Sequence, residues 1–108
     1  MIRATIFHCN DGLAVGFTVK CHGDPIVCSA VSMLAINTLN SIEKLTPLKQ
    51  ADFRAMWNKN GGFIAFALKR PQLRDTGAGI LLDSLVLGLH SVCEQYPKDL
   101  KIAIRKVM

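Results

Sequence analysis

The sequence predicts a two-layer α+β domain, in which a mostly antiparallel sheet carries two helices on one face in the order β-β-α-β-β-α-β. Two segments, residues 25–45 and 76–96, space their apolar residues as amphipathic helices do. The segments around them either alternate apolar and polar residues or are apolar throughout, as strands do. At 108 residues, of which 50% are hydrophobic, the chain is expected to form a single domain spanning residues 1–108.

A β-hairpin is predicted at the start of the chain. Residues 2–9 and 13–21 read as strands, and they flank an Asn-Asp-Gly turn at 10–12 whose glycine suits a positive φ. The side of the second strand that faces the core is expected to consist of Val15, Phe17, Val19 and Cys21. His22 then emerges with the opposite parity, or from the frayed end of the strand, where a functional group can be presented.

The first helix is predicted over residues 25–45. Asp24 is a favourable N-cap, and Pro25 suits the first helical position because its missing N–H would be unpaired there. Thr46 and Pro47 end the helix. Residues 48–57 fit either a short helix or a strand, and a turn is expected at 58–62. The remaining elements are a strand at 63–68, a helix that begins at 76–79 and stops at Pro97, and a strand at 100–105.

The turn into the first helix carries candidate thiol chemistry. Cys28 falls on about the first turn, where the helix dipole and unpaired N–H groups favour a thiolate. His22 is close enough in sequence to act as the base of a Cys–His pair, and Ser32 shares the helix face of Cys28. A free cysteine is, however, often a small buried apolar residue, and a lone histidine is often structural. Residue spacing alone leaves both interpretations open.

A zinc site is the competing interpretation of this region. His8, Cys9, Cys21, His22 and Cys28 are residue types that bind zinc. No Cys-x-x-Cys or paired histidine spacing is present, and adjacent strand residues point to opposite faces of a sheet. No metal and no cofactor are therefore expected.

Two blocks of the sequence resemble the ribosomal-processing cysteine protease family Prp. The first comprises His22 and the run Ile-Val-Cys-Ser-Ala-Val-Ser at 26–32, and the second comprises Leu-Val-Leu-Gly-Leu at 85–89 and Gln-Tyr-Pro at 95–97. The resemblance implies that Cys28 and His22 are the catalytic pair and that Ser32 belongs to the site. It also favours a strand over a helix for residues 48–57. Gly23 and Asp24, which lie between the pair, are expected to line it.

The resemblance also implies a function. Prp enzymes are cysteine endopeptidases that remove the N-terminal extension of a large-subunit ribosomal protein, and they are expected to form homodimers. Backbone N–H groups at the helix start are then candidate oxyanion donors. This chain departs from the family pattern in a shorter loop between His22 and Cys28, in Cys21 for the usual glycine, and in Pro25 for the usual aspartate. The alternative is a non-catalytic relative that binds a ribosomal-protein peptide or partner without cleaving it.

Charge and cysteine usage suggest the setting of the protein. The net charge is +5 and the pI about 9.3, but the basic residues are dispersed along the sequence and aromatic residues are few, so direct nucleic-acid binding is not expected. No signal peptide or membrane span is predicted, since Asp83 interrupts the longest apolar run. Four cysteines without a secretion signal indicate reduced thiols and a cytoplasmic location.

Overall fold

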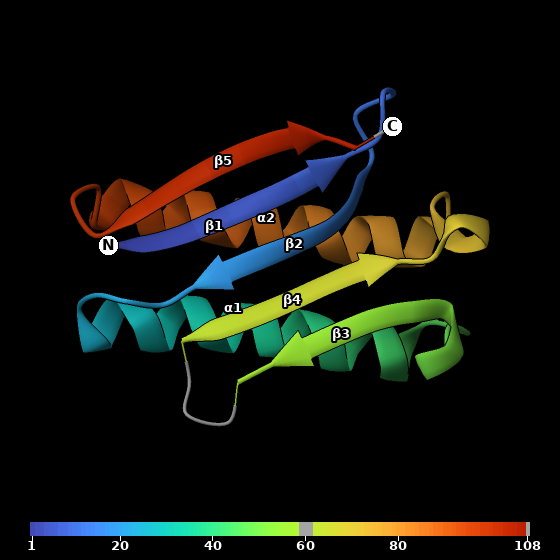
Figure 1. The fold of residues 1–108 in the computed structure, drawn as a ribbon, viewed down its shortest axis with the longest axis horizontal. Coiled ribbons are helices and arrows are strands. Elements are labelled where there is room, and N and C mark those ends of the chain that lie inside the picture. The colour runs from blue at the N-terminus through green and yellow to red at the C-terminus, as the bar shows by residue number, and fades with distance from the viewer. Residues whose placement is uncertain (59–61, 108) are drawn as a thin grey trace.

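The structure, a computed structural model, describes residues 1–58 and 62–107 and has the predicted α+β architecture (Figure 1). The order of strands and helices agrees with the sequence prediction, with two short 3₁₀ turns added at Gln50–Asp52 and Arg70–Gln72. The elements are β1 (Ile2–His8), β2 (Ala14–Lys20), α1 (Pro25–Leu45), β3 (Phe53–Trp57), β4 (Phe63–Leu68), α2 (Thr76–Gln95) and β5 (Leu100–Lys106).

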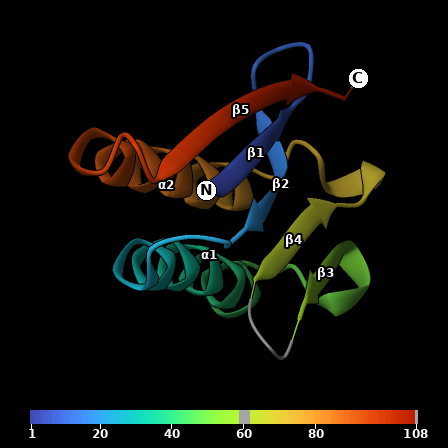
Figure 2. The same cartoon turned by 60° about the vertical axis from the view of Figure 1, so that its left-hand side comes forward.

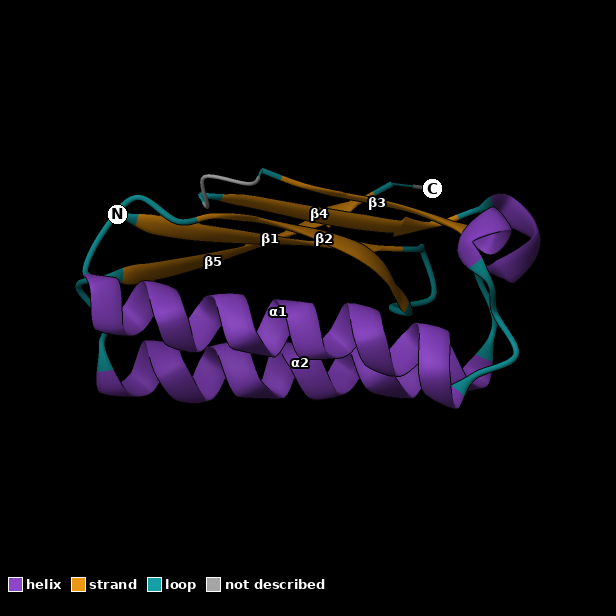
Figure 3. Cartoon of the chain, turned by 90° about the horizontal axis from the view of Figure 1, so that it is seen from below, coloured by secondary structure: helices purple, strands orange, loops and turns teal. Residues whose placement is uncertain are grey.

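The five strands form one sheet in the order β3-β4-β2-β1-β5. Neighbouring strands are antiparallel except β1 and β5, which pair in parallel. Both helices lie on the same face of the sheet, and none of the described residues forms a second layer on the opposite face (Figure 3). The two helices lie side by side along that face of the sheet (Figure 2). They approach closely at Gly88, where an added Cβ would lie 3.0 Å from Cδ2 of Leu34.

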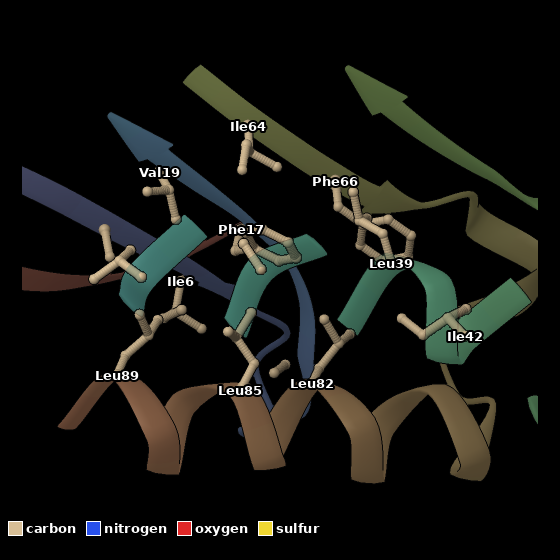
Figure 4. Packing of buried hydrophobic residues seen from close by; sticks show 14 of the residues in the cluster. Ile6, Phe17, Val19, Leu39, Ile42, Ile64, Phe66, Leu82, Leu85 and Leu89 are labelled. Atoms are coloured by element: carbon tan, nitrogen blue, oxygen red, sulfur yellow. The ribbon is translucent and has the colours of Figure 1, made fainter. Parts of the chain in front are cut away.

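The core lies between the sheet and the helices (Figure 4). Leu82, Leu85 and Leu89 project from α2 toward the sheet, because residues three and four apart share one side of a helix. Phe17 of β2 and Phe66 of β4 are almost fully buried, with ring centroids 5.9 Å apart. The buried face of α1 consists of Val27, Val31, Ala35, Thr38, Leu39 and Ile42.

The local predictions hold with three qualifications. Gly12 in the hairpin turn has φ of 85°, as expected, but the strand register shifts between Phe7 and His8. Because of this irregularity, Ala14 joins the main core cluster, whereas Val15 is buried outside it. The ambiguous segment 48–57 contains a short 3₁₀ turn followed by β3, and most of the turn expected at 58–62 lies outside the described residues.

Helices α1 and α2 are both long and apolar enough, by length and composition alone, to cross a membrane. The same property is found in core helices of folded domains. Each helix here packs one face against the sheet and places charged residues such as Lys44 and Asp83 on its exposed side.

Candidate active site

Cys28 lies in the first turn of α1, which is held by a strong N-terminal cap. The Oδ1 atom of Asp24 accepts hydrogen bonds from the backbone N–H groups of Ile26 at 2.9 Å and Val27 at 3.3 Å. The Cys28 N–H donates to the Asp24 carbonyl at 2.8 Å, and Pro25 occupies the start of the helix. The Cys28 side chain is half-buried, so a reagent or a peptide can approach it from solvent.

This cap changes the expected source of oxyanion stabilisation. The N–H groups of Ile26, Val27 and Cys28 are all engaged by Asp24, and Pro25 has no N–H to offer. The helix start therefore presents no free donor to a substrate carbonyl in this conformation. An oxyanion donor at this position requires that the Asp24 carboxylate releases at least one of the two N–H groups that it caps.

Cys28 belongs to a cluster with Cys21 and Ser32. The Cys21 Sγ atom lies 3.5 Å from Ser32 Oγ, so the predicted site residue Ser32 is next to the end of β2. Burial raises the pKa of the Cys21 thiol, the hydrogen bond with Ser32 partly opposes this shift, and the neighbouring Cys28 thiol raises the pKa further. The raised pKa favours the thiol form of Cys21 over the thiolate, which is the nucleophilic form. All four cysteines are free thiols.

The exposed His22 lies in the loop between β2 and α1, and its ring is close to Gly62. The Cε1 atom of its ring is 3.5 Å from the position that a Cβ on Gly62 would occupy, and the Cys21 N–H donates to the Gly62 carbonyl at 2.8 Å. Within residues 1–58 and 62–107, the ring forms no hydrogen bond with the Cys28 thiol. The structure therefore places the predicted pair at the same end of the domain without joining the two side chains.

The loop backbone around His22 is anchored to β1. The Met1 nitrogen donates to the His22 carbonyl at 2.5 Å. At Gly23, an added Cβ would lie 3.2 Å from Cγ1 of Ile2, so this glycine permits the close passage of the loop over the strand. Gly23 and Asp24 therefore shape the loop and cap the helix.

A groove of about 1010 Å³ runs between α1 and strands β3 and β4. Cys21, Ser32 and Gly62 line it at the end nearest to Cys28 and His22. Trp57, which ends β3 and pairs with Ile64, lines the groove at this same end, and its side chain is 63% exposed. Ile36 lines the groove one helical turn beyond Ser32. Sequence analysis missed this groove because its walls come from segments whose juxtaposition depends on the β3–β4 pairing.

No group of three or more His, Cys, Asp or Glu side chains that could hold a metal ion occurs in the part of the chain that the structure describes. The five residues considered for zinc are divided between the two ends of β1 and β2, since His8 pairs with Ala14 while Cys21 follows the other end of β2.

Comparisons with known proteins extend these observations. Residues 1–101 match the family described as "Cysteine protease Prp". The ribosomal processing protease Prp from S. aureus, solved with a covalently linked product peptide, has a TM-score of 0.86 at 20% identity, covering 97% of this chain and 100% of that chain. A second structure of that protease, with a substrate peptide, has a TM-score of 0.85 at 18% identity and the same coverage of both chains.

SMU.848 from Streptococcus mutans has a TM-score of 0.84 at 23% identity, covering 99% of this chain and 96% of that one. The search of curated proteins found no significant match. At these identities the structural likeness shows a shared fold, whereas the sequence match extends over nearly the whole chain and includes His22, Cys28 and Ser32. The chain therefore belongs to the cysteine protease Prp family.

Proposed function

We propose that this protein is a cysteine endopeptidase that removes the N-terminal extension of a large-subunit ribosomal protein, with Cys28 as the nucleophile and His22 as its base. The supporting observation is the family match over residues 1–101, which contains both residues and the helix start that carries Cys28. The related S. aureus protein is described as a ribosomal processing protease and has been solved with product and substrate peptides.

In the proposed reaction, His22 takes the proton of the Cys28 thiol and the thiolate attacks the scissile carbonyl carbon. The imidazolium then protonates the leaving amine, and water hydrolyses the thioester to release the acid and regenerate the thiol. The His22 ring must first turn from Gly62 toward Cys28. Such tightening on substrate binding is common, because catalytic hydrogen bonds are often long or unmade in free enzymes.

The groove between α1 and β3 is the proposed seat of the peptide. Among the described residues, neither Cys28 nor His22 lines the groove, but it ends beside Cys21 and Ser32, and Cys21 neighbours Cys28. A peptide that extends beyond this end of the groove would reach the proposed nucleophile. Its walls include exposed apolar side chains, Ile36 and Trp57, that would bury apolar residues of the substrate.

The direct test is intact-mass spectrometry of the organism's own ribosomal-protein precursor incubated with the protein. The wild type is expected to cleave the precursor once, and Cys28→Ala is expected to leave it intact. Cys9→Ala is the matched control, because Cys9 is also a half-buried free thiol but lies at the hairpin, away from Cys28. Precursor left intact by folded wild-type protein, or cleaved by Cys28→Ala, would contradict the proposal.

Thiol labelling tests the proposed pair without a substrate. Iodoacetamide at neutral pH is expected to modify Cys28 faster than the other three cysteines, and His22→Ala is expected to slow this reaction. Equal and slow labelling of all four cysteines would argue against an activated nucleophile.

The second candidate is a non-catalytic relative that binds a ribosomal-protein peptide or partner. It is favoured by the short loop, by the unmade contact between His22 and Cys28, and by the capped N–H groups at the helix start. In that case the precursor peptide binds both the wild type and Cys28→Ala with equal affinity, and neither cleaves it.

The proposal includes a cytoplasmic homodimer. Three apolar side chains on the helices, Met33 of α1 and Ile80 and Leu87 of α2, are each more than 60% exposed. The helices therefore have apolar surface available for self-association. Light scattering coupled to gel filtration is expected to give twice the monomer mass. Leu87→Glu is expected to reduce the mass to that of a monomer, and a monomeric wild type would refute this part of the proposal.

A further inference from the structure

The face of the sheet that the helices leave open gathers basic residues that are far apart in the sequence. The pairing of β1 with its two neighbours places Arg3 opposite Lys20 on β2 and opposite Lys101 on β5. One row across the sheet is therefore Lys101, Arg3 and Lys20, and all three side chains are exposed. Arg105, two rows along β5, is exposed on the same face. We call these four residues the basic face.

The basic face has no compensating acidic residues. None of the eight Asp and Glu residues of the chain lies in any of the five strands. In the described part of the chain, no salt bridge involves Arg3, Lys20, Lys101 or Arg105, and the ion pair that is present joins Arg74 to Asp11. Like charges directly opposite each other in a sheet repel and destabilise it. A polyanion bound over the row would therefore reduce the electrostatic repulsion between Arg3 and the two lysines beside it.

The remaining side chains on this surface suit flat, unpaired bases. Phe7 lies in register with Arg105, and Phe63 lies in register with Lys20, so a half-buried aromatic ring is next to a cation in each of the two rows. Between these rows, Thr5 and Thr18 are directly opposite each other and contribute hydroxyl groups. Aromatic rings stack on bases while cations neutralise phosphates, and this combination is typical of sheets that bind single strands.

We propose that the basic face, together with Phe7 and Phe63, binds single-stranded RNA. A duplex is a poorer fit because reading its grooves requires a protruding helix or ribbon, whereas this surface is an uncovered sheet. RNA is preferred to DNA because the threonine hydroxyls between the rows can hydrogen-bond to 2′-hydroxyl groups. Nucleic-acid binding was not expected from the sequence, because the basic residues are dispersed along the chain. The strand register brings four of them together on one face. The four basic residues lie on the opposite side of the sheet from α1, whereas Phe63 also borders the groove proposed for the peptide. The proposal does not depend on proteolysis.

The test is fluorescence anisotropy with a labelled single-stranded RNA of about 12 nucleotides, a length within the range of sheet-type binding sites. The wild type is expected to bind at low salt, and the affinity should fall as salt is raised, with a logarithmic slope of about −0.7 for each phosphate neutralised. The variant Arg3→Gln/Lys101→Gln is expected to bind at least tenfold more weakly and to reduce the slope by about 1.4, since two contacts are lost.

The matched control is Lys44→Gln/Lys49→Gln, which removes the same charge from exposed positions at the end of α1 and beyond it. It is expected to retain wild-type affinity and slope. Phe63→Leu is expected to weaken binding without changing the slope, because it removes stacking and no charge. Circular dichroism confirms that each variant is folded, and cleavage of the precursor by Arg3→Gln/Lys101→Gln should match the wild type.

Several results would overturn the proposal. One is the absence of RNA binding at low salt, and another is an equal loss of affinity in the control variant, which would indicate a response to net charge alone. A third is binding of a single-stranded DNA of the same length and sequence, of duplex RNA or of phosphatidylserine vesicles with affinity equal to that for the single-stranded RNA. This would show that the surface recognises negative charge without selecting RNA.

Discussion

The cap at the start of α1 gives the sharpest test of how the candidate site is built. In Asp24→Ala, the N–H groups of Ile26 and Val27 lose their acceptor, and removal of such a cap costs about 1 kcal/mol of unfolding free energy, within a range of 0.5–2 kcal/mol. For a domain of this size, that loss lowers the melting temperature by roughly 4 to 6 °C. Asp24→Asn should retain most of the stability, because asparagine is an equally good N-cap.

Asp75 supplies a matched control at the start of α2, where its carboxylate accepts a hydrogen bond from the Ala78 N–H at 2.8 Å. Asp75→Ala is expected to lose a similar free energy of unfolding, measured by urea denaturation. Only Asp24→Ala, however, removes a carboxylate and frees N–H groups beside Cys28. Iodoacetamide is therefore expected to label Cys28 faster in Asp24→Ala than in the wild type, and at the wild-type rate in Asp75→Ala.

Two outcomes would refute this reasoning. If Asp24→Ala is as stable as the wild type, the two hydrogen bonds do not hold the helix start. If Cys28 is labelled more slowly in Asp24→Ala while the stability falls as predicted, the carboxylate supports the reactive thiol, and its competition for the N–H groups is the smaller effect.

Three further predictions concern stability. Gly16→Ala is expected to destabilise the fold by about 1–3 kcal/mol, because its Cβ would lie 2.5 Å from the Phe66 carbonyl oxygen. Gly79→Ala has nothing within 4 Å of its Cβ and should stabilise the fold by roughly 0.5–1 kcal/mol. Equal effects of the two substitutions in urea denaturation would contradict this. Phe66→Ala should cost about 3–5 kcal/mol, and a loss below 1 kcal/mol would show that the ring is not packed as described. Because burial raises the pKa of Cys21, the folded chain keeps a thiol proton at a pH at which the unfolded chain releases it. The contribution of Cys21 to the free energy of unfolding is therefore fully present below a pH of about 9 and is lost as the pH rises above that value. Cys21→Ala should flatten that decline, and an unchanged pH profile would exclude this cause.

The parts of the fold that depend on neighbouring residues were accessible from the sequence. The bounds of α1 follow from Asp24 and Pro25 at its start and Thr46 and Pro47 at its end, since caps and prolines act within a few residues. The hairpin turn with Gly12 is local in the same sense. Val15 shows the limit of this approach, because the register shift between Phe7 and His8 leaves Val15 without a partner on β1 and outside the main core cluster.

The candidate site divides in the same way. The sequence placed Cys28 on the first turn of a helix and Ser32 on the same side. It gave Cys21 a core-facing position but did not predict its contact with Ser32, which depends on how β2 lies over α1. Sequence also left the helix-start N–H groups free for an oxyanion, whereas the structure shows that Asp24 engages them. The distance from His22 to the thiol depends on the loop path and on Gly62, which no local pattern encodes.

By itself, the sequence determined the two helices, the hairpin, the strands at 63–68 and 100–105 and the helix turn that carries Cys28, because periodicity, caps and turn residues act over short distances. It left residues 48–57, which contain β3, open between a helix and a strand. Only the tertiary structure decided that β5 pairs in parallel with β1, that α1 and β3 enclose a groove, and that Arg3 lies between Lys20 and Lys101. These features join segments that are distant along the chain. Their register is set by the burial of the whole core, since a shift of one residue would turn each strand's apolar side chains toward solvent.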